Sequence, residues 1–179
     1  MAQEDYLNFN ANGYLEAGFH DMEINEIVEH FVTAFPTSNT RSSIIDGYKK
    51  HSAEVAALGV ACTEFLDGSF ASNKADPGDI DMVGFMDLAA VDALDAAAQA
   101  KLEALFSGKA TRATHLCDAY FVPTVPENHP NYSKLRAQRK YWMGEFGYDR
   151  EDCPKGIIRT QVAPAAHLPT PSAVGNESA

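Results

Sequence analysis

The segment Leu-Asp-Gly-Ser-Phe at residues 66–70, followed after a polar loop by Gly-Asp-Ile-Asp-Met at residues 78–82, carries most of the information in this chain. In a β-strand, side chains two positions apart point to the same face, so Asp79 and Asp81 should project together while apolar neighbours pack behind them. Adjacent carboxylates raise each other's pKa, and a divalent cation relieves their repulsion. We therefore expect a strand whose two carboxylates bind a metal ion.

Magnesium suits such a pair, because it binds one or two protein carboxylates and completes its shell with water and phosphate oxygens. We expect Mn²⁺ to be able to replace it. The turn at Gly68 and Ser69 supplies the complementary half of the site, since a glycine turn brings backbone N–H groups close to an anion and a hydroxyl can donate to a phosphate oxygen. These features predict a metal-dependent nucleotide site; the alternative is a surface loop that contains both motifs by chance.

The two motifs resemble the signature of the nucleotidyltransferase superfamily typified by DNA polymerase beta. That signature has Gly followed by Gly or Ser, a short spacer, and Asp-x-Asp or Asp-x-Glu; here nine residues separate Ser69 from Asp79. Asp67 departs from the general pattern, which prefers an apolar residue before the Gly. The resemblance implies a minimal nucleotidyltransferase fold of the α+β class, with a mixed β-sheet flanked by helices.

The superfamily also uses a third carboxylate on a later strand, and Asp118, in the β-rich run 114–122, is the best candidate. The resemblance implies that Asp79 and Asp81 bind two metal ions and that Asp118 binds the ion that activates the acceptor. Asp118 could also take the proton of the acceptor. The alternative for Asp118 is an acid at a strand edge that faces water.

A narrower resemblance covers almost the whole chain. Residues 9–22, Asp67 with the turn after it, Lys74, residues 77–81 and residues 155–157 are similar to an uncharacterised bacterial family of stand-alone nucleotidyltransferase-like proteins. Within this group Asp67 is no longer an exception. The resemblance implies no particular substrate.

Three cations are further candidates for binding the nucleotide, together with Gly68 and Ser69. Lys74 lies in the loop between the motifs, where an ammonium could reach a phosphate or simply be solvated. Lys155 and Arg159 flank a short apolar strand and could complete a phosphate or acceptor pocket, or they could be ordinary surface cations.

Three other side chains have weaker claims. Tyr141 and Trp142, in a late helix, could stack on a base, but aromatic residues at helical spacing are more often part of the core. His20 could act as a base on the acceptor side, although a lone histidine has many structural uses.

Hydrophobic periodicity and turn residues predict four helices and four strands in a single domain over residues 1–162. Residues 1–22 are expected to be an irregular lead-in to the first helix, and residues 163–179, rich in Pro, Ala, Ser and Thr, a disordered tail. The expected helices cover residues 23–35, 40–59, 91–106 and 132–146, and the expected strands cover residues 60–66, 79–86, 111–122 and 156–162.

The composition of the chain argues against some classes of binding partner. Acidic residues outnumber basic ones 25 to 14, for a formal charge of −11, whereas a protein that grips long duplex nucleic acid usually offers a basic face. No apolar run is long enough to span a bilayer, so we expect no membrane partner. The three cysteines have no metal-ligand spacing and suit a reducing cytoplasm.

The sequence thus predicts a cytoplasmic enzyme that transfers a nucleoside monophosphate from a nucleoside triphosphate. The acceptor could be a protein hydroxyl, a tRNA 3′ end or a small molecule. Small proteins of this kind resemble members of toxin–antitoxin or phage-defence pairs, which implies a cognate protein partner. The competing hypothesis is a catalytically silent module that binds a nucleotide or a partner.

Overall fold

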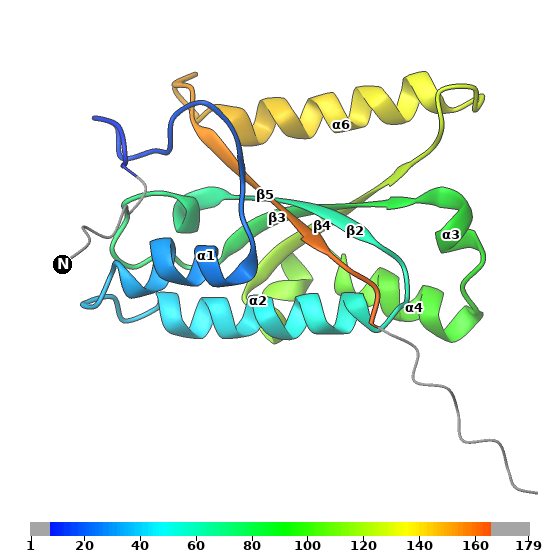
Figure 1. Ribbon diagram of the computed structural model, residues 1–179, viewed down its shortest axis with the longest axis horizontal. Helices are drawn as coiled ribbons and strands as arrows, with labels where there is room; N and C mark the ends of the chain where they lie inside the picture. Colours follow the sequence, from blue (N-terminus) through cyan, green and yellow to red (C-terminus); the bar gives the residue numbers. More distant parts are fainter. Residues whose placement is uncertain (1–7, 166–179) are drawn as a thin grey trace, which may run out of the picture.

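A five-stranded mixed β-sheet forms the centre of the computed structural model, which describes residues 8–165 (Figure 1). The strand order is β1-β5-β2-β3-β4; β1 pairs with β5 and β3 with β4 in parallel, while β2 runs antiparallel to both β3 and β5. The expected α+β class with a mixed sheet is confirmed. The strands are β1 (Gly18–Asp21), β2 (Cys62–Asp67), β3 (Ile80–Asp87), β4 (Cys117–Thr124) and β5 (Gly156–Val162).

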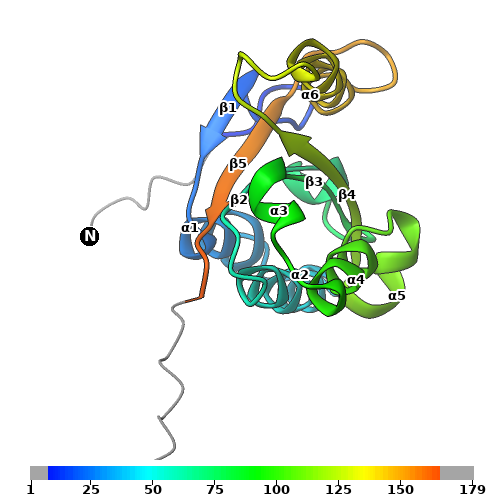
Figure 2. The same ribbon diagram turned by 90° about the vertical axis from the view of Figure 1, so that its right-hand side faces the viewer.

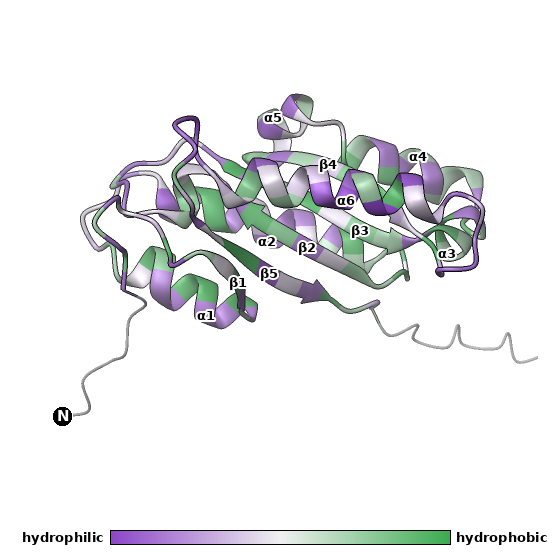
Figure 3. Cartoon of the chain, turned by 90° about the horizontal axis from the view of Figure 1, so that it is seen from above, coloured by the Kyte–Doolittle hydropathy of each residue, from purple (hydrophilic) through white to green (hydrophobic). Residues whose placement is uncertain are grey.

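Helices cover both faces of this sheet. Figures 1 and 2 show α1, α2 and α4 on one face and α6 alone on the other. Figure 3, a view onto α6, shows that this helix carries many hydrophilic residues on its outward surface. The helices are α1 (Ile24–Val28), continued by a π-helical turn (Glu29–Thr33), α2 (Arg41–Ala56), α3 (Leu88–Asp92), α4 (Ala96–Leu105), α5 (Arg112–His115) and α6 (Tyr132–Gly147), with short 3₁₀ turns at Gly68–Ala71 and Lys109–Thr111.

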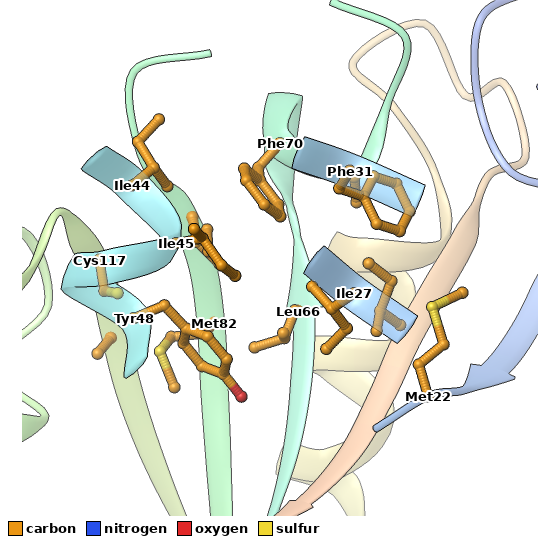
Figure 4. Close-up of a cluster of buried hydrophobic side chains, with 14 of the residues drawn as sticks. Met22, Ile27, Phe31, Ile44, Ile45, Tyr48, Leu66, Phe70, Met82 and Cys117 are labelled. Atoms are coloured by element: carbon orange, nitrogen blue, oxygen red, sulfur yellow. The ribbon is translucent and has the colours of Figure 1, made fainter. Parts of the chain in front are cut away.

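The alternation of side chains along the strands divides the core into two layers. Leu66 and Met82 point towards α1 and α2, where they pack with a buried cluster shown in Figure 4. Phe65 and Val83 point the other way and pack beneath Phe146 of α6. The odd-numbered positions of β2 and β3, which include Asp67 and Asp81, therefore belong to the α6 side.

The strand expected over residues 111–122 begins later than predicted. Residues Lys109–Thr111 and Arg112–His115 form helical turns, and only from Cys117 does the chain enter β4. Leu116 takes a left-handed conformation (φ 54°) between them. The segment before Leu116 is polar and has no strand to pair with, so local helical hydrogen bonds satisfy its backbone.

The lead-in expected to be irregular contains β1, which pairs with β5 from Gly18 to Asp21. A strand of four residues leaves too short a pattern to be read from the sequence, because long-range pairing creates it. The helix expected over residues 91–106 is two helices, since Asp95 accepts a hydrogen bond from the Ala98 N–H and starts α4 anew. Of the tail, residues 166–179 lie outside the described part of the chain.

In the described part of the chain, no helix combines the length and apolar character that crossing a bilayer requires.

A buried carboxyl lies in the layer between the sheet and α2. Glu64 is fully buried, and one of its oxygens accepts a hydrogen bond from the Tyr48 hydroxyl at 2.7 Å, while the other has no hydrogen-bond partner among residues 8–165. Burial raises the pKa of Glu64 to about 7 even though the Tyr48 hydrogen bond lowers it. A carboxylate at this position therefore destabilises the fold near neutral pH.

Replacing Glu64 with Gln should stabilise the protein above neutral pH. The pKa of Glu64 is higher in the folded protein than in the unfolded chain, so its contribution to stability is complete below pH 4.5 and is lost as the pH rises to about 7. We expect Glu64→Gln to raise the free energy of unfolding at pH 8 by about 1–3 kcal/mol, and the gain should vanish towards pH 4.5. Urea titrations of both proteins across this range measure it; an equal gain at every pH would contradict the argument.

Candidate functional site

Three carboxylates lie side by side across three neighbouring strands. Asp81 on β3 pairs in register with Asp67 on β2 and with Asp118 on β4. Asp79 lies just before β3, two positions from Asp81. The structure therefore brings together the three predicted carboxylates and adds a fourth, Asp67. Asp118 is nearly fully buried, which excludes the alternative of an acid facing water at the strand edge.

These carboxylates line an open cavity of about 940 Å³ on the α6 side of the sheet. Its walls include the four carboxylates and most of the other candidates from the sequence; they are Gly68, Ser69, Lys74 and Lys155, with Arg112, Tyr141 and Trp142 beside them. A nucleotide-sized molecule fits such a volume.

The four carboxylates place several negative charges in a partly buried site, where burial disfavours the ionised form of each carboxyl group. Burial and the neighbouring charges of Asp79 and Asp118 raise the pKa of Asp81. Burial also raises the pKa of Asp67 to about 6, although the Lys155 ammonium lowers it. One buried oxygen of Asp118, Oδ1, accepts no hydrogen bond from the part of the chain that the structure describes. The cluster therefore has unused capacity for a cation.

Two basic side chains balance part of this charge. Lys155 Nζ donates to Asp67 Oδ2 in a short, mostly buried ion pair. Arg112 bridges two carboxylates, with Nε 2.6 Å from Asp79 Oδ2 and Nη2 2.8 Å from Asp118 Oδ2. Sequence reasoning missed Arg112, because the segment that carries it was expected to be a strand.

The donor chemistry suits magnesium, because four carboxylates line the cavity. Within residues 8–165, however, no three His, Cys, Asp or Glu side chains already surround one point as metal ligands. Arg112 instead bridges two of these carboxylates, Asp79 and Asp118. The residues fit a divalent cation in kind, provided that Arg112 moves.

The turn after β2 depends on glycine. Gly68 has a φ of 78°, a conformation that L side chains rarely adopt, and a Cβ at this position would overlap the Asp81 carboxylate. Ser69 follows it in a 3₁₀ turn on the cavity wall. The Gly-Ser motif thus lets the turn approach the carboxylates closely.

Arg41 fixes the loop after this turn, a role the sequence did not signal. Its buried guanidinium donates to four backbone carbonyls: those of Phe31 (2.9 Å), Phe70 (2.8 Å), Ser72 (2.7 Å) and Lys74 (2.7 Å). Three of them belong to the loop that carries the candidate Lys74. Burial lowers the pKa of Arg41 to about 10, so it stays charged.

Two candidates lie away from the cavity. Arg159 forms an ion pair with Asp21 of β1 (Nε to Oδ1, 2.5 Å) and stacks over Phe19, four positions along β5 from Lys155. His20 contacts the Glu16 carbonyl. Neither residue lines the cavity, so the predicted roles of Arg159 in nucleotide binding and of His20 as a base have no geometric support.

The two aromatic residues of α6, Tyr141 and Trp142, differ in burial. Trp142 is partly buried: it packs between Tyr120 and Phe146 at the border of the core and also lines the cavity. For Tyr141, 59% of the surface is exposed, and it lies on the cavity wall. The expectation that Tyr141 is a core residue is wrong, because most of its surface is exposed.

Replacing Gly68 with Ala should displace Asp81. We expect Gly68→Ala to cost about 1–3 kcal/mol in the free energy of unfolding, from the left-handed backbone and the overlap with the carboxylate. Gly78→Ala is the matched control, because a Cβ at Gly78 meets nothing within 4 Å. It should change stability by less than about 0.5 kcal/mol. Urea unfolding of both variants measures the difference, and equal stability would refute the close packing of this turn.

Replacing Arg41 with Met should leave four carbonyls without a donor. We expect a loss of at least about 3 kcal/mol in the free energy of unfolding. Lys49→Met, an exposed position on the same helix, serves as the control for the loss of one positive charge and should change stability by less than about 0.5 kcal/mol. A similar loss in both variants would mean that the charge of α2 matters and the carbonyl contacts do not.

The chain matches a family model described as "Family of unknown function (DUF6932)" over residues 7–161. No curated protein and no solved structure matches it. Because the model covers the strands, the Gly-Ser turn and all four carboxylates of the cavity, the site described above lies inside the region that defines the match. The protein belongs to the family of unknown function DUF6932.

Proposed function

We propose that this protein is a metal-dependent nucleotidyltransferase with a polymerase beta-like fold, which transfers a nucleoside monophosphate from a nucleoside triphosphate to an acceptor hydroxyl. The observation that supports this most is the register of Asp81 with Asp118, which puts two carboxylates from separate segments next to each other on one face of the sheet. Asp79 and the turn at Gly68 border the same cavity.

In this reaction, an acceptor oxygen forms a bond to the α-phosphorus, the bond between the α- and β-phosphates breaks, and pyrophosphate leaves. Asp79, Asp81 and Asp118 would hold Mg²⁺ or Mn²⁺, which supplies positive charge to the attacking and leaving oxygens. The protein itself mainly positions the reactants and stabilises developing charge.

The chain's own residues divide this work by their place in the cavity. The backbone N–H groups at Gly68 and Ser69 and the Lys74 ammonium would bind phosphate oxygens. Asp118, whose Oδ1 is free of protein donors in the described region, would accept the proton of the attacking hydroxyl. Lys155 would hold Asp67 in place beside Asp81.

One observation favours the alternative of a silent nucleotide-binding or partner-binding module. Arg112 already neutralises Asp79 and Asp118, as a structural ion pair in a non-catalytic protein would. The two functions differ in one outcome: an enzyme transfers part of the nucleotide to an acceptor, whereas a silent module only binds. The candidate acceptors are a protein, a tRNA and a small molecule.

Label transfer tests the proposal. The protein is incubated with nucleoside triphosphates labelled on the α- or the γ-phosphate, Mg²⁺ or Mn²⁺, and cell extract separated into protein, RNA and small-molecule fractions. We expect transfer of the α-label alone, because a phosphotransferase would move the γ-label instead. Asp79→Ala with Asp81→Ala, and separately Asp118→Ala, should lower the rate below about one-hundredth of that of the unmodified protein.

Asp46→Ala is the matched control, since Asp46 is an exposed acid on α2 that does not line the cavity. It should leave the rate unchanged. Nucleotide binding without transfer of any label, in all fractions, would support the silent module.

A further inference from the structure

Arg112 lies where it blocks the carboxylates that the proposed reaction uses. Its guanidinium bridges Asp79 and Asp118, which belong to segments almost forty positions apart in the chain. The Arg112 side chain is 44% exposed, whereas those of Asp79 and Asp118 are 16% and 5% exposed. Arg112 thus covers the two carboxylates from the solvent side.

The charge balance explains why a cation is needed there. Asp67 has Lys155 as its partner, but Asp79, Asp81 and Asp118 share only Arg112 among the charged residues that form ion pairs in residues 8–165. Removing Arg112 would leave Asp79 and Asp118 without an ion-pair partner in the described residues and Asp81 with only the more distant charge of Lys155. Repulsion among the three carboxylates is costly where water is partly excluded.

Arg112 can leave without disturbing the core, provided that another cation takes its place. It begins α5 and its side chain is 44% exposed, so rotation into water would break its two ion pairs but no core packing. Lys155 differs, because its side chain is only 12% exposed and its partner Asp67 is buried. The site therefore has one fixed cation and one exchangeable cation.

We propose that Arg112 is the resident cation of this site, which neutralises Asp79 and Asp118 in the metal-free protein and which a divalent cation must displace in order to bind. The inference rests on the proposed function and adds that Arg112 competes with the metal ion for the carboxylates. Metal affinity is then set by two opposing effects: the carboxylates attract the ion, and Arg112 competes for the same oxygens. The charge of Arg112, and not only its shape, carries the competition.

Direct metal binding tests this without an activity assay. Binding of Mn²⁺ is measured by electron paramagnetic resonance of the free ion, at low ionic strength after chelator treatment, for the unmodified protein, Arg112→Gln, Arg112→Lys and Lys109→Gln. Lys109 is the matched control, since it is an exposed cation three positions away that does not line the cavity. The two Gln variants have the same net charge.

We expect Arg112→Gln to bind Mn²⁺ about tenfold more tightly than the unmodified protein, and Lys109→Gln to stay within about twofold. Arg112→Lys, which keeps the charge but loses the planar fork, should lie between them. In chelator, Arg112→Gln should melt at a lower temperature than the unmodified protein, and Mn²⁺ should raise its melting temperature more. Arg112→Lys keeps the test open if the Gln variant does not fold.

Two results would overturn the inference in different ways. Equal or weaker Mn²⁺ binding by Arg112→Gln would show that Arg112 does not compete, and the proposed function would stand. Absence of binding to all four proteins up to about 10 mM Mn²⁺ would remove the metal requirement of the proposed function, and the inference with it.

Discussion

The crowding of negative charge at one end of the sheet is the constraint around which the rest of the molecule is arranged. Strand register alone places Asp67, Asp81 and Asp118 in a row, where burial and mutual repulsion raise the pKa of Asp81. A fold of marginal stability does not tolerate such a row without compensation. Arg112, which bridges Asp79 and Asp118, and Lys155, which pairs with Asp67, supply this compensation.

Some residues of the site could be predicted from the local sequence, and others could not. The alternation of acids with apolar residues indicates Asp79 and Asp81, and the resemblance to the nucleotidyltransferase superfamily, together with the β-rich run, indicates Asp118 as a third carboxylate. Arg112 and Arg41 could not be identified, because neither belongs to a motif. Arg41 contacts carbonyls up to 33 positions away, and Arg112 acts between two segments that only the register of β3 and β4 brings together.

Two errors share a physical cause. The segment before β4 and the short strand β1 were both misjudged because tertiary pairing, and not local propensity, decides whether a polar stretch becomes a strand. Arg159 was a candidate because, with Lys155, it flanks a short apolar strand. Four positions on a strand span about 13 Å, which carries Arg159 out of the cavity to Asp21.

The two cations of the site, Lys155 and Arg112, are attached to different parts of the fold. Lys155 immediately precedes β5, the strand that lies between β1 and β2 in the sheet, and its partner Asp67 is at the end of β2. Arg112 enters on a short helix at the rim, beside edge strand β4, and contributes little to the core. A cation built into the sheet stabilises a buried carboxylate permanently, whereas a cation at the rim can yield to a ligand. Lys155 and Arg112 carry the same charge, but they differ in how firmly the surrounding structure holds them. For this reason the pair of Lys155 with Asp67 is structural, whereas a metal ion could replace Arg112 at Asp79 and Asp118.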